Sequence, residues 1–215
     1  FLTGTICAHR CQNKCSRNFY DESVHIRDTK LVAAENGYGA LMASLKPTEK
    51  LPGKKAAIIG GGPTGIAAAY FLARGGVETT IFEREAKLGG VPRYAIPAFR
   101  ISDEALDKDV ALMERLGVEV KCGAPAPSVD ELKKMGYTHI LMATGAWQAG
   151  ELGIPGNVKG VIGWMKEMKQ QVKPCLEGHV VVVGAGNTAM DAARVAKRMG
   201  AASSTIVYEE GNARR

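Results

Sequence analysis

The sequence has few aromatic residues, no long apolar run and no concentrated basic segment. No apolar stretch approaches the roughly 20 residues that a membrane-spanning helix needs, so we expect no membrane association. The formal net charge is +6, yet no run of Lys and Arg interleaved with aromatic residues concentrates it. We therefore expect no nucleic-acid partner.

The N-terminal sequence FLTGTICAHRCQNKC lacks the charged-then-apolar pattern of a secretion signal. The five cysteines are odd in number, and three of them lie close together near the N-terminus. This pattern argues against a secreted disulfide framework and for reduced thiols with a metal or redox role. We expect a cytoplasmic protein.

The composition is that of a globular protein, with 46% hydrophobic and 23% charged residues. Two stretches with Pro, Gly and polar residues, KPTEKLPGKK and LGIPGNVKG, divide the chain into zones. The expected domains are a helical head over residues 1–50, a domain over 51–152 and a partial domain over 153–215.

Hydrophobic periodicity predicts strands and helices that alternate along most of the chain. In the head, HIRDTKLVAAENGYGALMASL predicts a helix that breaks near residues 37–39. The predicted strands are residues 55–59, 78–82, 118–122, 138–144, 179–183 and 205–208. The predicted helices are residues 64–74, 103–116 with Ser102 as N-cap, 188–199, and a short one opened by the Ser128–Glu131 capping box.

This order predicts an α/β protein with a Rossmann-like parallel sheet followed by a second, incomplete Rossmann-like unit. The last zone offers too few strands to hide the apolar face of its sheet. We therefore expect a fragment of a longer protein.

Two glycine-rich turns follow predicted strands and open predicted helices. In the first, Gly60, Gly62 and Gly65 form G-x-G-x-x-G, which permits a tight turn, close approach of a pyrophosphate and close packing of helix on strand. Glu83 ends the next strand, where a carboxylate can accept hydrogen bonds from ribose hydroxyls. These features predict a dinucleotide site, against the alternative that the glycines serve packing alone.

The second turn contains Gly184, Gly186 and Ala189, with alanine at the packing position. One dinucleotide does not need two such turns. Two turns about 120 residues apart indicate two nucleotides brought face to face, one donating a hydride and the other receiving it.

Several segments together resemble a known family. AAIIGGGPTGIAAAYFLARGG, LGG, AIPAFRIS, LMATGA, GIPG and VVVGAGNTAMDAAR occur in that order. The chain resembles the FAD- and NAD(P)H-dependent small subunit of glutamate synthase, with relatives among selenate-reductase-like proteins and in the N-terminal part of dihydropyrimidine dehydrogenase. The resemblance covers nearly the whole sequence.

The resemblance implies that the first turn holds FAD and the second holds NADH or NADPH. It places Glu83 on the FAD ribose, Gly89, Gly90 and Arg100 near the flavin or its phosphates, and the strand end at Ala143 against the cofactor. The full set expected to bind the cofactors is Gly60, Gly62, Pro63, Thr64, Gly65, Glu83, Arg84, Gly89, Gly90, Arg100, Ala143, Thr144, Gly145, Gly184, Gly186, Asn187, Thr188 and Ala189.

The cysteine head leaves three alternatives open: a zinc site, an iron–sulfur cluster or plain thiols. Cys7, Cys11 and Cys15 are spaced C-x3-C-x3-C, and His9 is the only obvious fourth ligand, which disfavours zinc. The resemblance implies that the three cysteines ligate [4Fe-4S] clusters in the intact protein, whose other ligands would lie upstream. Lys30 stands where some relatives supply a non-cysteine ligand, and an ammonium cannot ligate.

We interpret Cys122 and Cys175 as buried apolar groups. No Cys-x-x-Cys pair accompanies the flavin motif, which counts against a thioredoxin-reductase-type enzyme. Asp191 is either a solvated helix residue or a structural partner of the second turn.

These features predict an NAD(P)H-dependent flavoprotein oxidoreductase that passes a hydride to FAD and single electrons to iron–sulfur centres and a redox partner subunit or domain. No catalytic acid or base is expected, because the cofactor carries the reaction. Glu209 and Glu210 favour NADH, whereas the nearby Arg214 and Arg215 suit a 2′-phosphate. The alternative is a non-catalytic FAD-binding scaffold or sensor with metal-binding thiols.

Overall fold

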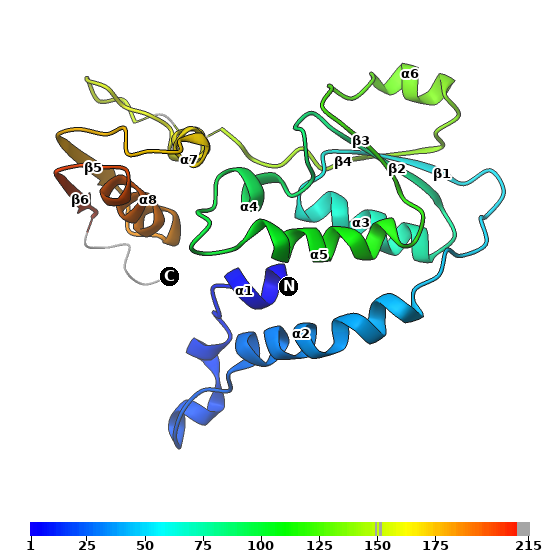
Figure 1. Ribbon diagram of the computed structural model, residues 1–215, viewed down its shortest axis with the longest axis horizontal. Coiled ribbons are helices and arrows are strands. Elements are labelled where there is room, and N and C mark those ends of the chain that lie inside the picture. Colours follow the sequence, from blue (N-terminus) through cyan, green and yellow to red (C-terminus); the bar gives the residue numbers. More distant parts are fainter. Residues whose placement is uncertain (149, 151, 210–215) are drawn as a thin grey trace. The chain divides into compact units, whose positions relative to one another are not determined.

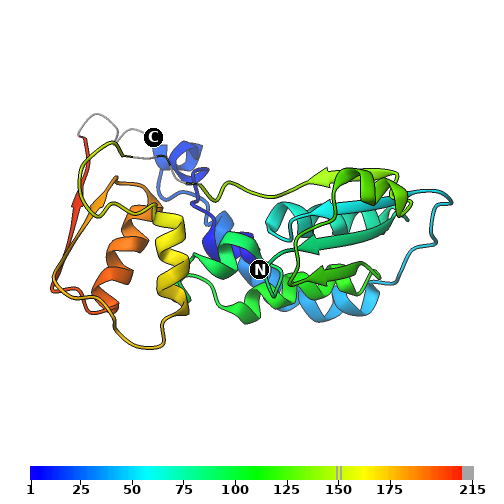
Figure 2. The same cartoon turned by 90° about the horizontal axis from the view of Figure 1, so that it is seen from above.

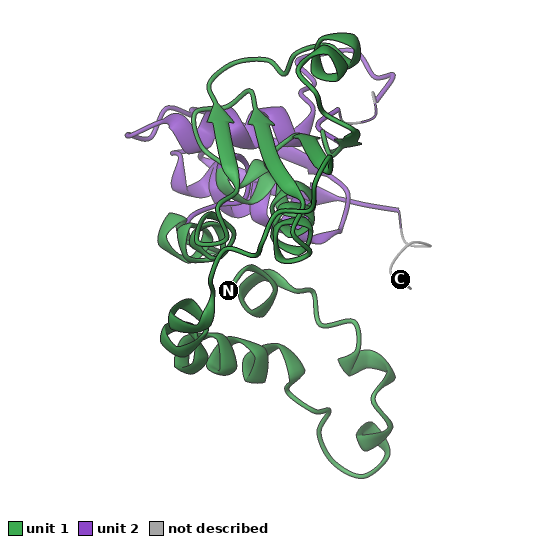
Figure 3. Ribbon diagram, turned by 90° about the vertical axis from the view of Figure 1, so that its right-hand side faces the viewer, with its two compact units in different colours: residues 1–93, 99–145 green, residues 94–98, 146–215 purple. Residues whose placement is uncertain are grey.

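The computed structural model describes residues 1–148, 150 and 152–209, and it divides into two compact units (Figure 3). The first unit contains residues 1–93 and 99–145. The second contains residues 94–98 and the described residues from 146 onward. The head thus groups with the first glycine turn, and the predicted domain boundaries stay predictions.

A parallel four-stranded sheet forms the centre of the first unit (Figure 1). Its strands are β1 (Lys55–Ile59), β2 (Glu78–Glu83), β3 (Glu119–Cys122) and β4 (His139–Met142). Their order is β3-β2-β1-β4, with Ala57 of the inner strand β1 paired to Thr80 on one side and Ile140 on the other. This confirms the predicted Rossmann-like α/β fold.

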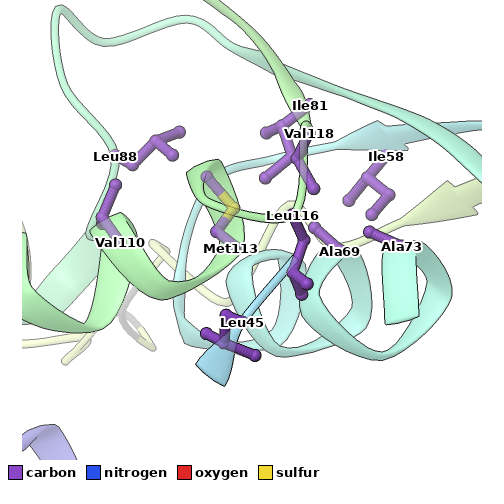
Figure 4. Packing of buried hydrophobic residues seen from close by; sticks show 10 residues of the cluster. All are labelled: Leu45, Ile58, Ala69, Ala73, Ile81, Leu88, Val110, Met113, Leu116 and Val118. Atoms are coloured by element: carbon purple, nitrogen blue, oxygen red, sulfur yellow. The ribbon is translucent and has the colours of Figure 1, made fainter. Parts of the chain in front are cut away.

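Helices α3 (Pro63–Arg74) and α5 (Asp103–Glu114) cover one face of this sheet, and α6 (Val129–Lys134) lies on the other (Figure 1). Because side chains alternate along a strand, Ile58 points into the core under α3 and α5, whereas Ala57 faces Leu132 and Tyr137. Figure 4 shows the larger core. Its buried residues are Leu45, Ile58, Ala69, Ala73, Ile81, Leu88, Val110, Met113, Leu116 and Val118.

Side chains cap two of these helices as the sequence predicts. The Ser102 hydroxyl accepts a hydrogen bond from the Ala105 amide at 3.2 Å, at the start of α5. Ser128 and Glu131 form the predicted capping box of α6. A short helix that was not predicted, α4 (Gly90–Tyr94), links β2 to α5.

The head consists of α1 (Leu2–Ile6), the 3-10 turns η1 (Gln12–Lys14) and η2 (Ser16–Phe19), and α2 (Ile26–Ser44). Helix α1 packs against both α2 and α5. The predicted break in α2 is wrong: the helix continues through Gly37 and Gly39. A mid-helix glycine costs only about 1 kcal/mol relative to alanine, which does not end a 19-residue helix.

The second unit has a two-stranded parallel sheet, β5 (His179–Val183) and β6 (Ser203–Val207), joined by α8 (Asn187–Arg198). Helix α7 (Val161–Gln170), which was not predicted, packs beside α8 (Figure 2). The side chains of Ala192 and Ala196 on α8 are buried, whereas Val181 and Val183 of β5 are exposed. The unit therefore covers one face of its small sheet.

Two cysteine predictions need correction. Cys122 and Cys175 are exposed rather than buried, because β3 is an edge strand and Cys175 lies in the loop before β5. Among the described residues, no helix is long and apolar enough to cross a membrane.

Candidate functional site

The first glycine turn connects β1 to α3 through residues whose backbones come unusually close to other segments. Gly60 has a φ of +108°, a conformation that favours glycine, and its amide donates to the Phe82 carbonyl at 2.8 Å. A Cβ at Gly60 would collide with the Ala143 carbonyl, and a Cβ at Gly65 would collide with the Gly60 carbonyl. The predicted tight turn and close helix packing are therefore present.

Glu83 is buried at the end of β2 and fixes the first glycine turn through hydrogen bonds to backbone amides. Its Oε2 accepts the Gly61 amide at 2.6 Å, and its Oε1 accepts the Glu85 amide at 2.9 Å. Both oxygens retain further lone pairs, so the same carboxylate can accept hydroxyl donors. The predicted ribose contact stays a prediction, and Gly61 is a residue that the sequence reasoning passed over.

The loop from Leu88 to Gly90 closes over the same turn. The Gly89 amide donates to the Gly61 carbonyl at 2.8 Å, and a Cβ built on Gly90 would stand 2.8 Å from Gly62 Cα. Gly89 and Gly90 have φ values of +130° and +56°. The structure thus brings two glycines of the LGG segment onto the glycine turn.

Arg93, on α4, was missed by the sequence reasoning. Its guanidinium donates from Nε to the Leu88 carbonyl and from Nη2 to Asp107, and its side chain is buried. No sequence motif marks this residue, because its partners come from a loop and from α5.

The strand end after β4 also meets the turn. The Ala143 amide donates to the Ile59 carbonyl at 2.8 Å, and a Cβ on Gly60 would be 3.2 Å from Thr144 Cα. Gly145 follows with a φ of +73°. Arg100 is half-buried just before α5, and Arg84 is exposed after β2, where it pairs with Glu85.

The residues present fit the phosphates of a dinucleotide. Among the described atoms, a Cβ built on Gly62 would have only Gly90 Cα within 4 Å, at 3.8 Å, so a ligand can approach this backbone closely. Helix α3 opens with Pro63 and Thr64, both exposed, and its N-cap residue, Gly62, has no side chain to cap the N-terminal amides. Uncapped amides at the positive end of a helix bind pyrophosphate well.

The second turn repeats this geometry between β5 and α8. The Gly184 amide donates to the Val207 carbonyl at 2.8 Å, as Gly60 does to Phe82, and Gly184 has a φ of +121°. Gly186 precedes α8 without a side-chain cap, and a Cβ built there would meet no described atom within 4 Å. Asn187 and Thr188 are exposed in the first turn of the helix, while Ala189 is buried.

Two acidic residues near the second turn differ in environment. Asp191 is buried within α8, which favours the structural-partner interpretation over a solvated one. Tyr208 follows Val207, so it stands where Glu83 stands in the first unit, and Glu209 comes next. Both are exposed. Glu210, Arg214 and Arg215 lie outside the described residues.

The cysteine head does not assemble a metal site in the described part of the chain. Both ring nitrogens of His9 are engaged: Arg27 donates to Nε2 at 2.6 Å, so Nδ1 carries the proton and donates to Gln12 at 2.7 Å. The amides of Val24 and Arg17 lower the pKa of the Cys15 thiol. The three cysteines alone do not fit a cluster, and their ligand role stays a prediction.

Comparison with known proteins places this geometry in a family. A family model described as pyridine nucleotide-disulphide oxidoreductase matches residues 54–214. The match spans both glycine turns. Despite the family's name, all five cysteines of this chain are free thiols.

Over 213 residues the chain is 41% identical to "Putative oxidoreductase YgfK" of Escherichia coli K12, covering 96% of this chain and 21% of that protein. It is 34% identical to "NADPH-Fe(3+) oxidoreductase subunit beta" of Geobacter sulfurreducens, covering 96% of this chain and 32% of the relative. It is 30% identical to the NADPH glutamate synthase small chain of Mycobacterium tuberculosis, and the alignment covers 93% of this chain and 45% of that protein. The chain thus spans less than half of each relative.

Among solved structures, histamine dehydrogenase from Rhizobium sp. 4-9 aligns with a TM-score of 0.56 at 18% identity, covering 76% of this chain and 25% of that one. This likeness shows the fold. The relatives confirm the predicted resemblance to the glutamate synthase small subunit. With a family match over most of its length, the chain belongs to the pyridine nucleotide-disulphide oxidoreductase family, which confirms the prediction that it comes from an oxidoreductase family.

Proposed function

We propose that this chain is the cofactor-binding part of an NAD(P)H-dependent flavoprotein that feeds electrons to a redox partner subunit or domain. The observation that carries the proposal is the first glycine turn, closed by Glu83, the Leu88–Gly90 loop and Ala143. Family membership supports a pyridine nucleotide, and the resemblance to glutamate synthase small chains supports FAD.

In this proposal each residue of the first turn binds or orients FAD. The free amides at the start of α3 take the pyrophosphate, and the open backbone at Gly62 allows its close approach. Glu83 accepts the ribose hydroxyls while it fixes the Gly61 amide. When bound, FAD supplies the chemistry, accepting a hydride from NAD(P)H and releasing its electrons singly.

The second turn would bind the nicotinamide nucleotide at the start of α8. The repeat of the Gly60 hydrogen bond at Gly184 supports this assignment. Glu209 would repel a 2′-phosphate and so favours NADH, whereas two relatives are named as NADPH-dependent proteins. NADH and NADPH are therefore both tested as donors.

The electron acceptor belongs to the proposal as well. Two relatives are named as a beta subunit and a small chain, which supports a partner subunit or domain. In the part of the chain that the structure describes, the three head cysteines do not form a complete metal site. Reduced, free cysteines support a cytoplasmic location.

Anaerobic mixing of the full-length flavoprotein with NADH and with NADPH tests the function. We expect either NADH or NADPH to bleach the flavin absorbance after mixing, and an added one-electron acceptor to restore that absorbance. A flavin-bearing protein that stays yellow with both donors would instead support the non-catalytic scaffold or sensor.

A further inference from the structure

The Leu88–Gly90 loop touches the first glycine turn on several sides at once. The Gly89 amide donates to the Gly61 carbonyl at 2.8 Å, and Gly90 packs on Gly62. A Cβ on Gly61 would fall on the Leu88 side chain, which is itself part of the core (Figure 4). Any movement of this loop therefore changes the surroundings of Gly61 and Gly62.

The loop itself is held by one buried cation, Arg93, whose side chain is 4% exposed. The guanidinium donates from Nε to the Leu88 carbonyl and from Nη2 to Asp107 Oδ1. Its Nη1 lies 3.4 Å from Asp103 Oδ2 and has no hydrogen-bond partner among the described residues. Arg93 thus ties the loop to the first two turns of α5.

The side chain also sets the backbone of Gly89. A Cβ built on Gly89 would stand 2.7 Å from Arg93 Cβ, and Gly89 has a φ of +130° that other residues rarely adopt. The stem of Arg93 fills the place that a side chain at Gly89 would need. Loop conformation and arginine position therefore depend on each other.

A lysine cannot replace this arginine. The planar guanidinium presents several N–H groups in fixed directions, so it can donate to a carbonyl and to a carboxylate at once. An ammonium on a flexible stem is a point charge, and placed against Asp107 it would leave the Leu88 carbonyl without its donor.

We propose that Arg93 is a positioning residue for the FAD site, holding the Leu88–Gly90 loop so that the loop fixes the phosphate-binding backbone at Gly61 and Gly62. This inference rests on the proposed function, because it assigns FAD to the first turn. Arg93 acts through Leu88 and Gly89 and need not touch the cofactor. Its effect belongs to the first turn and leaves the nucleotide at the second turn unaffected.

The test measures FAD and NAD(P)H dissociation constants on the full-length protein, with the flavin removed and then titrated back. Arg93→Lys should raise the FAD dissociation constant about tenfold or more, because a charged hydrogen bond to a buried carbonyl is lost. The NAD(P)H constant should stay at the wild-type value, whereas the thermal midpoint of the flavin-free protein should fall by a few degrees, because a buried hydrogen bond is lost. Arg115→Lys, at an exposed arginine after α5, is the matched control and should change nothing.

Asp107→Asn keeps the arginine and guards against a lysine variant that fails to fold. Asp107 is exposed on α5, and its loss should weaken FAD binding severalfold in the same selective way. Added to Arg93→Lys, the Asp107→Asn substitution should weaken FAD binding little further, since both substitutions remove the same link between the loop and α5.

Other results would overturn the inference. If the wild type binds FAD and the Arg93 and Asp107 variants bind it equally well, the loop needs no such tether. If the affinities for FAD and for NAD(P)H fall by the same factor, Arg93 only stabilises the fold. A wild type that binds no FAD would show that the proposed function itself has failed.

Discussion

Glu83 holds the glycine turn with both of its carboxylate oxygens, through the amides of Gly61 and Glu85. In Glu83→Gln one of these oxygens becomes an NH2 group that faces an amide donor. A buried donor left without its acceptor costs about 1–3 kcal/mol, so we expect FAD affinity to fall about tenfold or more. Fluorescence titration of the flavin-free protein measures this change.

Glu78→Gln is the matched control, because Glu78 begins the same strand but is exposed and pairs with Lys55 at the surface. Its FAD affinity should equal that of the wild type. Equal affinity in both variants would mean that the Glu83 carboxylate does not shape the site.

The thiols of Cys15 and Cys122 have pKa values shifted in opposite directions. Backbone amides of Val24 and Arg17 lower the pKa of Cys15, whereas partial desolvation, with the nearby Glu83 and Glu114, raises the pKa of Cys122. A lower pKa leaves more reactive thiolate at a given pH. In metal-free protein, alkylation of Cys15 should therefore rise at lower pH than that of Cys122, as followed by peptide mass spectrometry.

If the alkylation of the two cysteines followed the same pH profile, the opposite pKa shifts would be wrong. The sequence had led us to expect Cys122 to be buried as an apolar group. The residue follows an apolar strand pattern, but edge position in the sheet leaves it exposed.

At the scale of the elements, the two glycine turns differ at their third position. A Cβ on Gly65 would collide with the Gly60 carbonyl, whereas in the second turn Ala189 Cβ lies 4.0 Å from the ideal Cβ position of Gly184. Gly65→Ala should therefore destabilise the first unit by about 1–3 kcal/mol, the usual range for overpacking. Thermal unfolding measures the loss.

Ala189→Gly provides the complementary variant in the second turn. It removes a methyl group that the turn accommodates, and so should cost no more than about 1 kcal/mol, the helix propensity difference. A Gly65→Ala variant as stable as the wild type would show that α3 can move away from β1 without cost.

The strands and long helices could be predicted because periodicity and caps reside in the local sequence. β1 and β5 match their predicted bounds, and Ser102 and Ser128 mark the helix starts as expected.

Helix α4 could not be predicted, since its conformation depends on Gly90 at positive φ and on the hydrogen bond from Arg93 to α5. Helix α7 begins at Val161, and its N-cap residue Gly160 has no side chain to cap it, so the local sequence carries no start signal.

The residues of the candidate site that belong to a sequence motif could be predicted. Those whose role depends on tertiary contacts could not. The glycine spacing identified Gly60, Gly62 and Gly65, and the resemblance pointed to Gly89, Gly90 and the strand end at Ala143, all of which lie at one turn. Gly61 and Arg93 were missed, because their roles arise from contacts with Glu83, Leu88 and Asp107 that no local sequence pattern marks.

At the scale of the whole molecule, we expect each unit to bind one nucleotide. Valine at Gly60 would be strained at a φ of +108° and would strike the Ala143 carbonyl. Valine at Gly184 would be strained at +121°, within the other unit. The two substitutions should therefore separate flavin binding from reduction by NAD(P)H.

The most direct measurement is the FAD content of full-length Gly60→Val and Gly184→Val proteins, followed by anaerobic addition of NADH and NADPH. We predict that Gly60→Val is purified without flavin, while Gly184→Val keeps FAD but is bleached by neither donor. A Gly60→Val protein that retains its full complement of FAD, or a Gly184→Val protein reduced at the wild-type rate, would contradict the account.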